Sequence, residues 1–512
     1  MSWVLLGLVS VLASFWLRWR YKNRRLLAMA KNFPGPPTLP GLGNALKFVC
    51  KPEELITVIK ELIREYGDVM RFWLGPDLNI VVSDPDSIKT ILTNNKNSYK
   101  GPQCRFMVDI LGGGILSGSG PTWRKHRKIA NPNYGKRAIE SYESVFNRET
   151  DLLMLKLRSI PINRQFDIYE CIVTTTSYVV CQTLMGLDKE QTINLPHIHP
   201  IIEKTPPLYD IVFDRMTKWY LQIEPIFWMT KEYQQQKQFI EMMTEFSAKI
   251  VQHRMETLKN LEKEEMNLMN SEEDSSRNTK LSVIDRFILS QELKRDELLK
   301  ETFTIFTSSQ EASAKISSFT LLMMAYHPDC QEKLYKEIKT VIGDKDRHVT
   351  SEDLKQMPYL DMVFKEVLRL FPIGAMLQRT ITEDIVLDSS VVPAGASLVI
   401  PIYHIHRDPR FWTKPEDFDP ERFNPVNTKL RNASCYIPFS LGPMDCLGRY
   451  FGTKLIKTIV VRILREFEVT SLNAYKDLQL TIAISTAPVN GFQLMLKPRD
   501  DSQIVDGDKH RN

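Results

Sequence analysis

Residues 439–448 read FSLGPMDCLG, which places Cys446 between Gly442 and Gly448. An apolar helical pattern follows at once, carried by Tyr450, Phe451, Leu455, Ile456, Ile459, Val460, Ile463 and Leu464. The glycines let the backbone approach a flat, large group, and a helix start favours a thiolate through its dipole and its unpaired N–H groups. This environment suits an axial thiolate on heme iron. The alternative is a buried free cysteine, and the spacing alone does not separate the two.

The pattern Phe-x-x-Gly-x-x-x-Cys-x-Gly, from Phe439 to Gly448, resembles the heme-binding loop of the cytochrome P-450 superfamily. Three further motifs occur in the family's order and with similar spacing, so the resemblance covers residues 33–499. It implies a mainly α fold with small β-sheets and a heme b whose iron is ligated by Cys446. Phe439, Gly442 and Gly448 would then form the cofactor-binding loop around this metal ligand.

Three residues elsewhere match family contacts to the heme propionates. Trp123 and Arg127 are four residues apart, so they share a helix face and can reach one partner. The resemblance gives this pair a propionate; otherwise it is a solvated basic face with a core tryptophan. Arg379, after Pro372, matches a second propionate-binding arginine. The family usually has Arg or His two residues before the cysteine for the same purpose, and this chain departs with Met444.

Residues 301–327 predict one long helix with a polar centre, where the family runs a helix across the heme. The aligned segment SSQEAS, which ends at Ser313, has Ala312 where the family has a threonine that helps deliver protons during oxygen activation. Glu311 can still act as a positioned acid. Ser313 offers a hydroxyl, but it lies ~100° further round the helix. In the fatty-acid-hydroxylating branch a glutamate can bond to heme at the Ser308 position, and serine cannot form that ester. The heme is therefore expected not to be covalently attached.

A charge network is expected behind the heme loop. Glu366 and Arg369 are three residues apart on one predicted helix face, and Arg422 follows about 50 residues later. In the family these three side chains form a buried network, whereas Glu-x-x-Arg alone is more often a surface salt bridge. His404 and His406 alternate in an extended run, and we interpret them as structural residues and not as metal ligands.

The composition excludes several other classes of protein. The net charge of +5 is small for 512 residues, and no basic stripe is interleaved with aromatic residues, so nucleic acid is not an expected partner. Seven scattered cysteines without a Cys-x-x-Cys pair argue against a disulfide framework or a zinc site. This cysteine pattern fits a reducing compartment that faces the cytosol.

No compositional break divides the chain, and one catalytic domain is expected over residues 41–499. Two hairpins are predicted within it. The first joins residues 71–74 to 79–83 through a Gly75-Pro76 turn. The second covers residues 480–496 and is turned by Asn490-Gly491.

Residues 2–17 are almost wholly apolar and uncharged. Basic residues follow them directly: Arg18, Arg20, Lys22, Arg24 and Arg25. This order favours an uncleaved transmembrane anchor over residues 1–25, because a signal peptide carries its positive charge first. The positive-inside rule places the rest of the chain in the cytosol. The run is short for a ~20-residue span, and a buried core helix is the alternative. A proline-rich hinge is expected over residues 26–40 and a polar tail over residues 500–512.

The resemblance is to membrane-bound, microsomal members, in the branch that includes fatty-acid omega-hydroxylases and many insect enzymes. It implies a monooxygenase of the endoplasmic reticulum membrane, with NADPH–cytochrome P-450 reductase as electron donor; cytochrome b5 as a second partner is left open. A lipophilic substrate such as a fatty acid, terpenoid or xenobiotic is expected. Two alternative functions remain open. One is a reductase-independent lipid hydroperoxide isomerase or dehydratase, which fits Ala312. The other is a non-catalytic heme- or lipid-binding member, which fits Met444 and Ala312 together.

Overall fold

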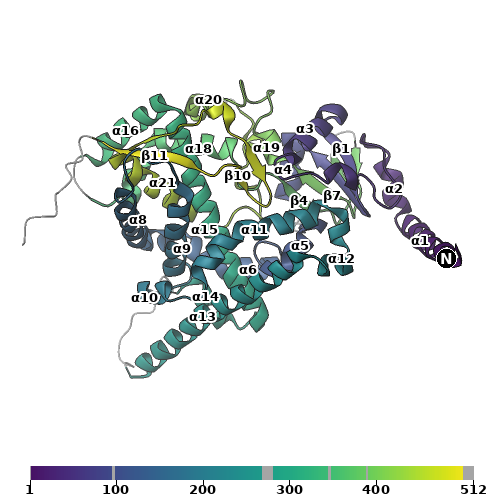
Figure 1. Cartoon of the computed structure of the whole chain (residues 1–512), viewed down its shortest axis with the longest axis horizontal. Coiled ribbons are helices and arrows are strands. Elements are labelled where there is room, and N and C mark those ends of the chain that lie inside the picture. Colours follow the sequence, from purple (N-terminus) through teal and green to yellow (C-terminus); the bar gives the residue numbers. More distant parts are fainter. Residues whose placement is uncertain are drawn as a thin grey trace, which may run out of the picture.

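The structure is a computed structural model that describes residues 2–94, 99–267, 281–343, 347–387, 390–429 and 431–499. It is mainly helical with small β-sheets, as the resemblance implied (Figure 1). The polar tail predicted at residues 500–512 lies outside the described residues.

The α-helices are α1 (Ser2–Lys22), α2 (Arg24–Ala30), α3 (Leu55–Tyr66), α4 (Pro85–Thr93), α5 (Arg105–Leu111), α6 (Gly120–Ala130), α7 (Lys136–Ser141), α8 (Glu143–Arg158), α9 (Ile168–Thr183), α10 (Lys189–Ile193), α11 (Ile198–Thr217), α12 (Glu224–Trp228), α13 (Lys231–Asn267), α14 (Val283–Ser290), α15 (Arg295–Tyr326), α16 (Pro328–Ile342), α17 (Ser351–Lys355), α18 (Pro358–Leu370), α19 (Ile402–Ile405), α20 (Pro425–Lys429) and α21 (Arg449–Glu466). The strands are β1 (Val69–Leu74), β2 (Asp77–Val82), β3 (Phe166–Asp167), β4 (Leu377–Thr380), β5 (Ile385–Leu387), β6 (Ser390–Val392), β7 (Ser397–Ile400), β8 (Phe467–Thr470), β9 (Leu480–Ile482), β10 (Thr486–Pro488) and β11 (Gln493–Pro498).

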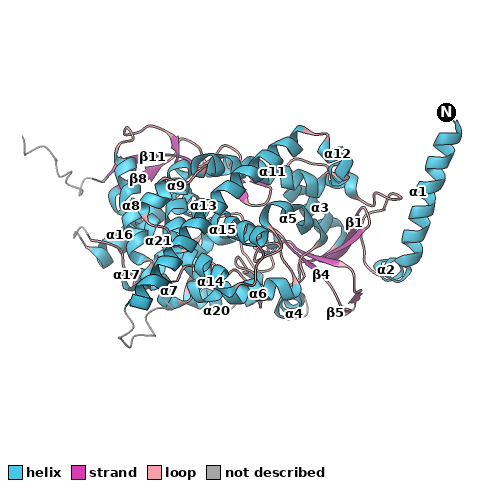
Figure 2. Ribbon diagram, turned by 90° about the horizontal axis from the view of Figure 1, so that it is seen from below, coloured by secondary structure: helices cyan, strands magenta, loops and turns pink. Residues whose placement is uncertain are grey.

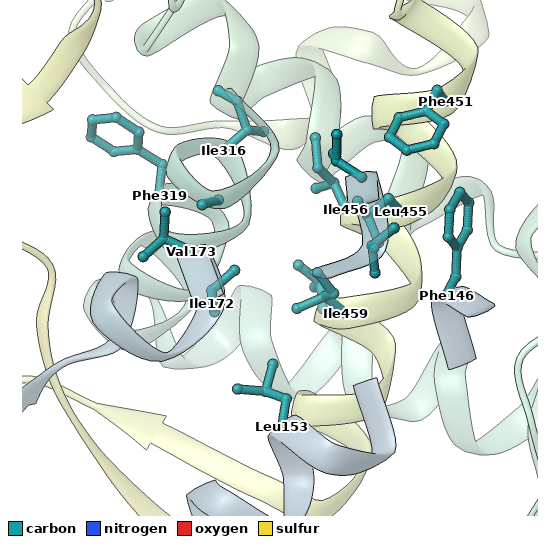
Figure 3. Close-up of a cluster of buried hydrophobic side chains, with 14 of the residues drawn as sticks. Phe146, Leu153, Ile172, Val173, Ile316, Phe319, Phe451, Leu455, Ile456 and Ile459 are labelled. Carbon is teal, nitrogen blue, oxygen red and sulfur yellow. The ribbon is translucent and has the colours of Figure 1, made fainter. Parts of the chain in front are cut away.

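Helix α15 is the long helix predicted over residues 301–327, and it runs through the interior against α9, α13 and α21. Its neighbours supply apolar faces that close one continuous core. Figure 3 shows part of this core, where side chains of α8, α9, α15 and α21 meet, among them Phe146, Ile172, Phe319 and Leu455. Helix α15 is covered by other elements on most sides. A face of α15 that is not buried is therefore an interior surface that no other described part of the chain covers.

The largest sheet has four strands in the order β1-β2-β7-β4. The first predicted hairpin is confirmed, since Val69 to Leu74 pair antiparallel with Val82 to Asp77. The second prediction was wrong about its turn. Strand β9 already pairs with β10 through residues 483–485, and the Asn490-Gly491 turn leads instead into β11. Strand β11 pairs with the distant strands β3 and β8, a long-range choice that local turn residues do not reveal.

Helix α1 stands away from the main body at one end of the molecule (Figure 2). It contacts the body through Trp19, whose ring meets Trp73 edge-on at 5.7 Å. Among the described residues, no helix combines the length and the apolar character needed to cross a membrane, which corrects the predicted transmembrane helix. Arg18, Arg20 and Lys22 fall inside α1 and shorten its uncharged run.

Candidate functional site

The loop that carries Cys446 is held in a fixed shape by its own backbone and by distant segments. The Cys446 N–H donates to the Phe439 carbonyl at 2.9 Å. Ser440 and Gly442 both have positive φ angles, +63° and +73°. A Cβ at Gly442 would overlap the Leu92 carbonyl of α4, so only glycine fits there. The loop ends at Gly448, the residue before α21 begins.

Burial raises the pKa of the Cys446 thiol. The Gly448 N–H and the Arg127 guanidinium act in the opposite direction and do not overcome that effect. The Gly448 N–H at the helix start favours the thiolate, as the sequence predicts, but burial has the larger effect on the pKa of Cys446. A bound metal deprotonates a coordinating thiol outright. Cys446 also keeps exposed surface, so its thiol borders an interior space.

A matching open surface lies on α15. Between Glu301 and Ala325 every residue of this helix is buried except Ser308, Ser309 and Ala312, which lie on one face. These are three of the positions that the resemblance aligned with the oxygen-handling segment.

Tyr134 connects this open face of α15 to the cysteine. Its phenol hydrogen-bonds Ser309, and its pKa is raised by burial first and further by the nearby Tyr142 and Cys446 groups. The thiol and the open face of α15 therefore border the same region of the interior.

Three predicted propionate ligands lie around this region. Trp123 is buried on α6, and Arg127 lies one turn further along the same helix. The Arg127 guanidinium donates to the Asp445 carbonyl at 2.7 Å and to Asp445 Oδ1 at 2.8 Å. Arg379 is 2% exposed and donates to the Gln378 carbonyl at 3.0 Å. Burial lowers the pKa of Arg379, which indicates that its cation has lost its water.

Lys100 is a further cation at this rim, and it was missed in the sequence. It pairs with Arg379 through a β-bridge, and burial together with the Arg379 charge lowers its pKa to about 8. No carboxylate among the described residues forms an ion pair with Lys100 or Arg379. Two desolvated cations side by side favour an anionic partner, such as the carboxylates of heme. The only sequence signal was a lysine directly before Gly101-Pro102 at the start of a glycine-rich loop.

The cysteine loop itself contributes two more features. The Arg449 guanidinium lies 5.2 Å from the centre of the Phe439 ring, and its buried Nε has no hydrogen-bond partner among the described residues. Met444, half-buried, presents a thioether where the family usually has a cation. A thiol donor, an open interior face and surrounding cations together fit a flat, anionic, iron-bearing group such as heme.

Glu311 and Ser313 are both buried, but they lie off the open face of α15. Glu311 Oε1 is 2.7 Å from Lys315 Nζ and accepts a hydrogen bond from Ser485 Oγ at 2.9 Å. The Tyr209 phenol also hydrogen-bonds this carboxylate. Ser313 Oγ donates to the Ser309 carbonyl at 2.7 Å. The structure thus brings Cys446 and Ala312 to one region and turns the Glu311 carboxylate away from it.

The Glu311 carboxylate instead lies behind a cleft of about 750 Å³ that opens to the surface. The cleft is bordered by α11, the segment before α3 and the β9–β10 hairpin, with Tyr209, Lys315 and Ser485 among its lining residues.

The predicted charge network behind the loop is confirmed. Arg369 contacts both Glu366 oxygens at 2.7 Å, with both side chains fully buried, and Arg422 Nε lies 3.3 Å from Glu366 Oε1. His406 belongs to the same support. Its Nε2 accepts the Ile437 N–H at 2.9 Å, two residues before Phe439, and its Nδ1 lies 3.2 Å from the Arg369 carbonyl. Both nitrogens have protein partners, as expected of a structural histidine.

Comparison with known proteins covers nearly the whole chain. The sequence model of the family "Cytochrome P450" matches residues 33–493. Cytochrome P450 4d2 of Drosophila melanogaster is 30% identical over 94% of this chain and 95% of the relative. Cytochrome P450 4c3 of the same organism is 28% identical over 94% and 91%. Cytochrome P450 4V2 of Homo sapiens is 27% identical over 97% and 94%. The resemblance found in the motifs is confirmed.

Proposed function

This chain belongs to the cytochrome P450 family, whose heme b is held non-covalently by a cysteine thiolate, and we propose that it is a monooxygenase that oxidises a lipophilic small molecule. The observation that carries the proposal is the placement of Cys446 and the open Ser308–Ala312 face of α15 around one interior region. Heme, when bound there, supplies the activation of dioxygen and the transfer of one oxygen atom to the substrate.

In this proposal the chain holds the cofactor through residues at opposite sides of the region. Cys446 ligates the iron, while Lys100, Arg379, Arg127 and Trp123 receive the two propionates. Gly442 and Gly448 keep the cysteine loop close to the heme plane, and Phe439 supports it beneath Arg449. The chain supplies no glutamate at Ser308, so the heme has no ester link to α15.

Protons for the reaction are proposed to pass through Glu311 and Ser313. Lys315 and Ser485 are buried but line the cleft beside α11, and Ser485 Oγ can pass a proton to Glu311 Oε1 along its 2.9 Å hydrogen bond. Ser313 follows Ala312 in sequence, and its hydroxyl donates to the Ser309 carbonyl. Ala312 itself provides no hydroxyl, so proton delivery is expected to be inefficient.

The proposed setting is the endoplasmic reticulum membrane, with the catalytic domain (residues 41–499) facing the cytosol. Helix α1 exposes Val11, Phe15, Leu17 and Tyr21, and the α11–α12 region exposes Trp228 and Met229. Such aromatic and apolar side chains next to basic residues suit a membrane interface. Residues 26–40 would be the hinge. Electrons would come from NADPH–cytochrome P-450 reductase, with cytochrome b5 as a second candidate donor, and the substrate would be a fatty acid, terpenoid or xenobiotic.

A second candidate function is the isomerisation or dehydration of lipid hydroperoxides without a reductase. The observation that favours it is the combination of Ala312 on the open face with a Glu311 carboxylate already occupied by Lys315, Ser485 and Tyr209. The O–O bond of a hydroperoxide is already substituted, so it does not need the protons that dioxygen requires before its O–O bond can break.

The test uses the purified, heme-loaded full-length chain. The reduced carbonyl complex should show the thiolate Soret band near 450 nm that marks this family, and Cys446→Ser should abolish it. Product with NADPH and reductase supports the monooxygenase, and product from a hydroperoxide alone supports the second candidate. An unchanged spectrum in Cys446→Ser, or no turnover with either system, contradicts the proposal.

A further inference from the structure

The loop of residues 112–118, between α5 and α6, is fastened to the same helix face that borders the interior region. Glu301, Thr304 and Ser308 are spaced three and four residues apart, so they lie along one face of α15. Thr304 Oγ1 donates to the Leu111 carbonyl at 2.8 Å, at the start of the loop. Glu301 Oε1 accepts the Ile115 N–H at 2.9 Å, in its middle. The loop is therefore attached within two helical turns of Ser308.

The second oxygen of this carboxylate is held by a histidine of α6. His126 Nδ1 lies 3.1 Å from Glu301 Oε2, and the two side chains are 3% and 1% exposed. His126 Nε2 is buried and has no hydrogen-bond partner among the described residues. A neutral ring protonated on Nδ1 leaves no buried N–H without an acceptor, so we assign that tautomer. Helix α6 also carries Trp123 and Arg127.

The carboxylate occupies the space that a side chain would take in the loop. A Cβ at Gly114 would overlap Glu301 Oε2 and would come within 2.8 Å of His126 Nδ1. At the adjacent Gly113, by contrast, a Cβ would meet nothing within 4 Å. Because Gly114 has no side chain, the Glu301 carboxylate can reach the loop backbone. Gly113 is a matched glycine in the same loop without this steric constraint.

We propose that Glu301 is a positioning residue that sets which apolar substrates the enzyme accepts. His126 holds its carboxylate, and Gly114 leaves room for that carboxylate beside the loop backbone. The residues it places are Ile115 and Leu116, which keep partly accessible apolar side chains while Gly114 and Ser117 on either side are buried. Displacing their backbone changes the shape of the apolar surface beside the open face of α15. The statement about substrates rests on the proposed function, whereas the anchoring of the loop does not depend on it.

The first measurement is hydrogen exchange of the loop amides in the heme-loaded protein. Gly114→Ala and Glu301→Ala should each speed exchange of the Ile115 amide by about 10-fold to 100-fold, the equivalent of one lost hydrogen bond to a charged group. Gly113→Ala should leave exchange unchanged, because a Cβ at Gly113 meets nothing within 4 Å. The double variant Gly114→Ala with Glu301→Ala should match Glu301→Ala alone, because both changes remove the same anchor. Unchanged exchange in Gly114→Ala, or full additivity in the double variant, overturns the proposal.

The second measurement is the ratio of dissociation constants for two probes of different shape, dodecanoic acid and limonene, followed by the heme absorbance change. The ratio should shift by about 10-fold in Gly114→Ala and Glu301→Ala, comparable to one misplaced apolar contact, and stay constant in Gly113→Ala. Faster exchange with a constant ratio means that Glu301 anchors the loop without setting specificity, which overturns the inference while the proposed function stands. Absence of the 450 nm band in wild type would instead contradict the proposed function, and the exchange measurement would still show whether Glu301 anchors the loop.

Discussion

Arg127 binds the residue directly before the cysteine: its guanidinium donates to the Asp445 carbonyl at 2.7 Å and to Asp445 Oδ1 at 2.8 Å. One side chain therefore fixes both the backbone and the carboxylate of Asp445. Because Arg127 belongs to α6, this contact ties that helix to the cysteine loop across 318 positions of sequence. A residue expected only to face a propionate thus also has a structural role.

Replacing Arg127 should destabilise the heme-loaded protein. Arg127→Met removes two hydrogen bonds to a half-buried partner, so we expect the free energy of unfolding to fall by about 1–2 kcal/mol. The measurement is the urea midpoint of unfolding, followed by tryptophan fluorescence. Lys128→Met makes the same change of charge at an exposed position of the same helix, and it should shift the midpoint little. Equal effects of the two substitutions would mean that helix charge, and not the Asp445 contact, is responsible.

Lys100 should contribute to heme retention. Lys100→Met removes a cation from the pair with Arg379, and a hydrogen bond to a charged group contributes ~1.5–3 kcal/mol, so heme loss should be about 10-fold faster. The measurement is the rate of heme transfer to an acceptor protein such as apomyoglobin. Lys89→Met, an exposed lysine of α4, serves as the control and should not change the rate. Met444→Arg adds the cation that the family usually has, and it should slow heme loss; an unchanged rate would show that Lys100 already replaces it.

Breaking the buried network should be far more costly than breaking a surface pair of the same spacing. Glu366→Gln leaves Arg369 buried without its counter-ion, and we expect a loss of about 3–5 kcal/mol. The matched control is Glu352→Gln, whose i,i+3 partner Lys355 is at 2.8 Å but where both side chains are more than half exposed. That pair should contribute less than about 1 kcal/mol. Similar urea midpoints for the two variants would contradict the structural role of the network.

His406 should make the protein less stable in mild acid. Burial lowers its pKa to about 3, while the unfolded chain keeps a value near 6.5. Between these two values the unfolded state binds a proton that the folded state does not, so stability is lost as the pH falls from 6.5 towards 3. His406→Gln should flatten the urea midpoint between pH 6.5 and pH 4, whereas the exposed His199→Gln should not. A wild-type slope in His406→Gln would assign the acid sensitivity to other groups.

Ala312→Thr should improve coupling if the enzyme is a monooxygenase. The added hydroxyl can hold the water that supplies protons, and positioned proton donors are typically worth ~10²–10⁴-fold, part of which Glu311 and Ser313 already provide. Product per NADPH should rise and hydrogen peroxide release should fall. Ala312→Val, of similar shape without the hydroxyl, is the control. With a lipid hydroperoxide as substrate, Ala312→Thr should leave turnover unchanged or reduce it. Equal coupling of NADPH to product in wild type and variant, measured with the reductase, would contradict the role given to residue 312.

The sequence predicted those features that are short and contiguous. The cysteine loop, the Glu366–Arg369 pair and α15 each occupy one stretch with a recognisable pattern. The interpretation of His406 as structural is supported by its two protein partners. The family resemblance singled out Ala312 by alignment, and the structure then leaves this residue on the open face of α15.

The missed features depend on partners that are far apart in sequence. The residues next to Lys100 in sequence do not predict its pairing with Arg379. In the same way, the residues next to Glu311 do not predict its hydrogen bond with Ser485, 174 positions away. The effect of burial on the Cys446 pKa also depends on the packed fold, and the local helix start does not reveal it. The turn at Asn490-Gly491 is real, but only long-range pairing decides that β11 joins β3 and β8.

The support of the cysteine loop also has a consequence for biosynthesis. The loop is shaped by Leu92, Arg127 and His406, and it lies close to the end of the 512-residue chain. Contacts of such large sequence separation form late, because closing long loops is entropically unfavourable. The thiol leaves the ribosome only after nearly all of its supports have been translated. Nascent chains arrested before residue 446 should therefore accumulate in a heme-free form whatever the supply of heme in the cell.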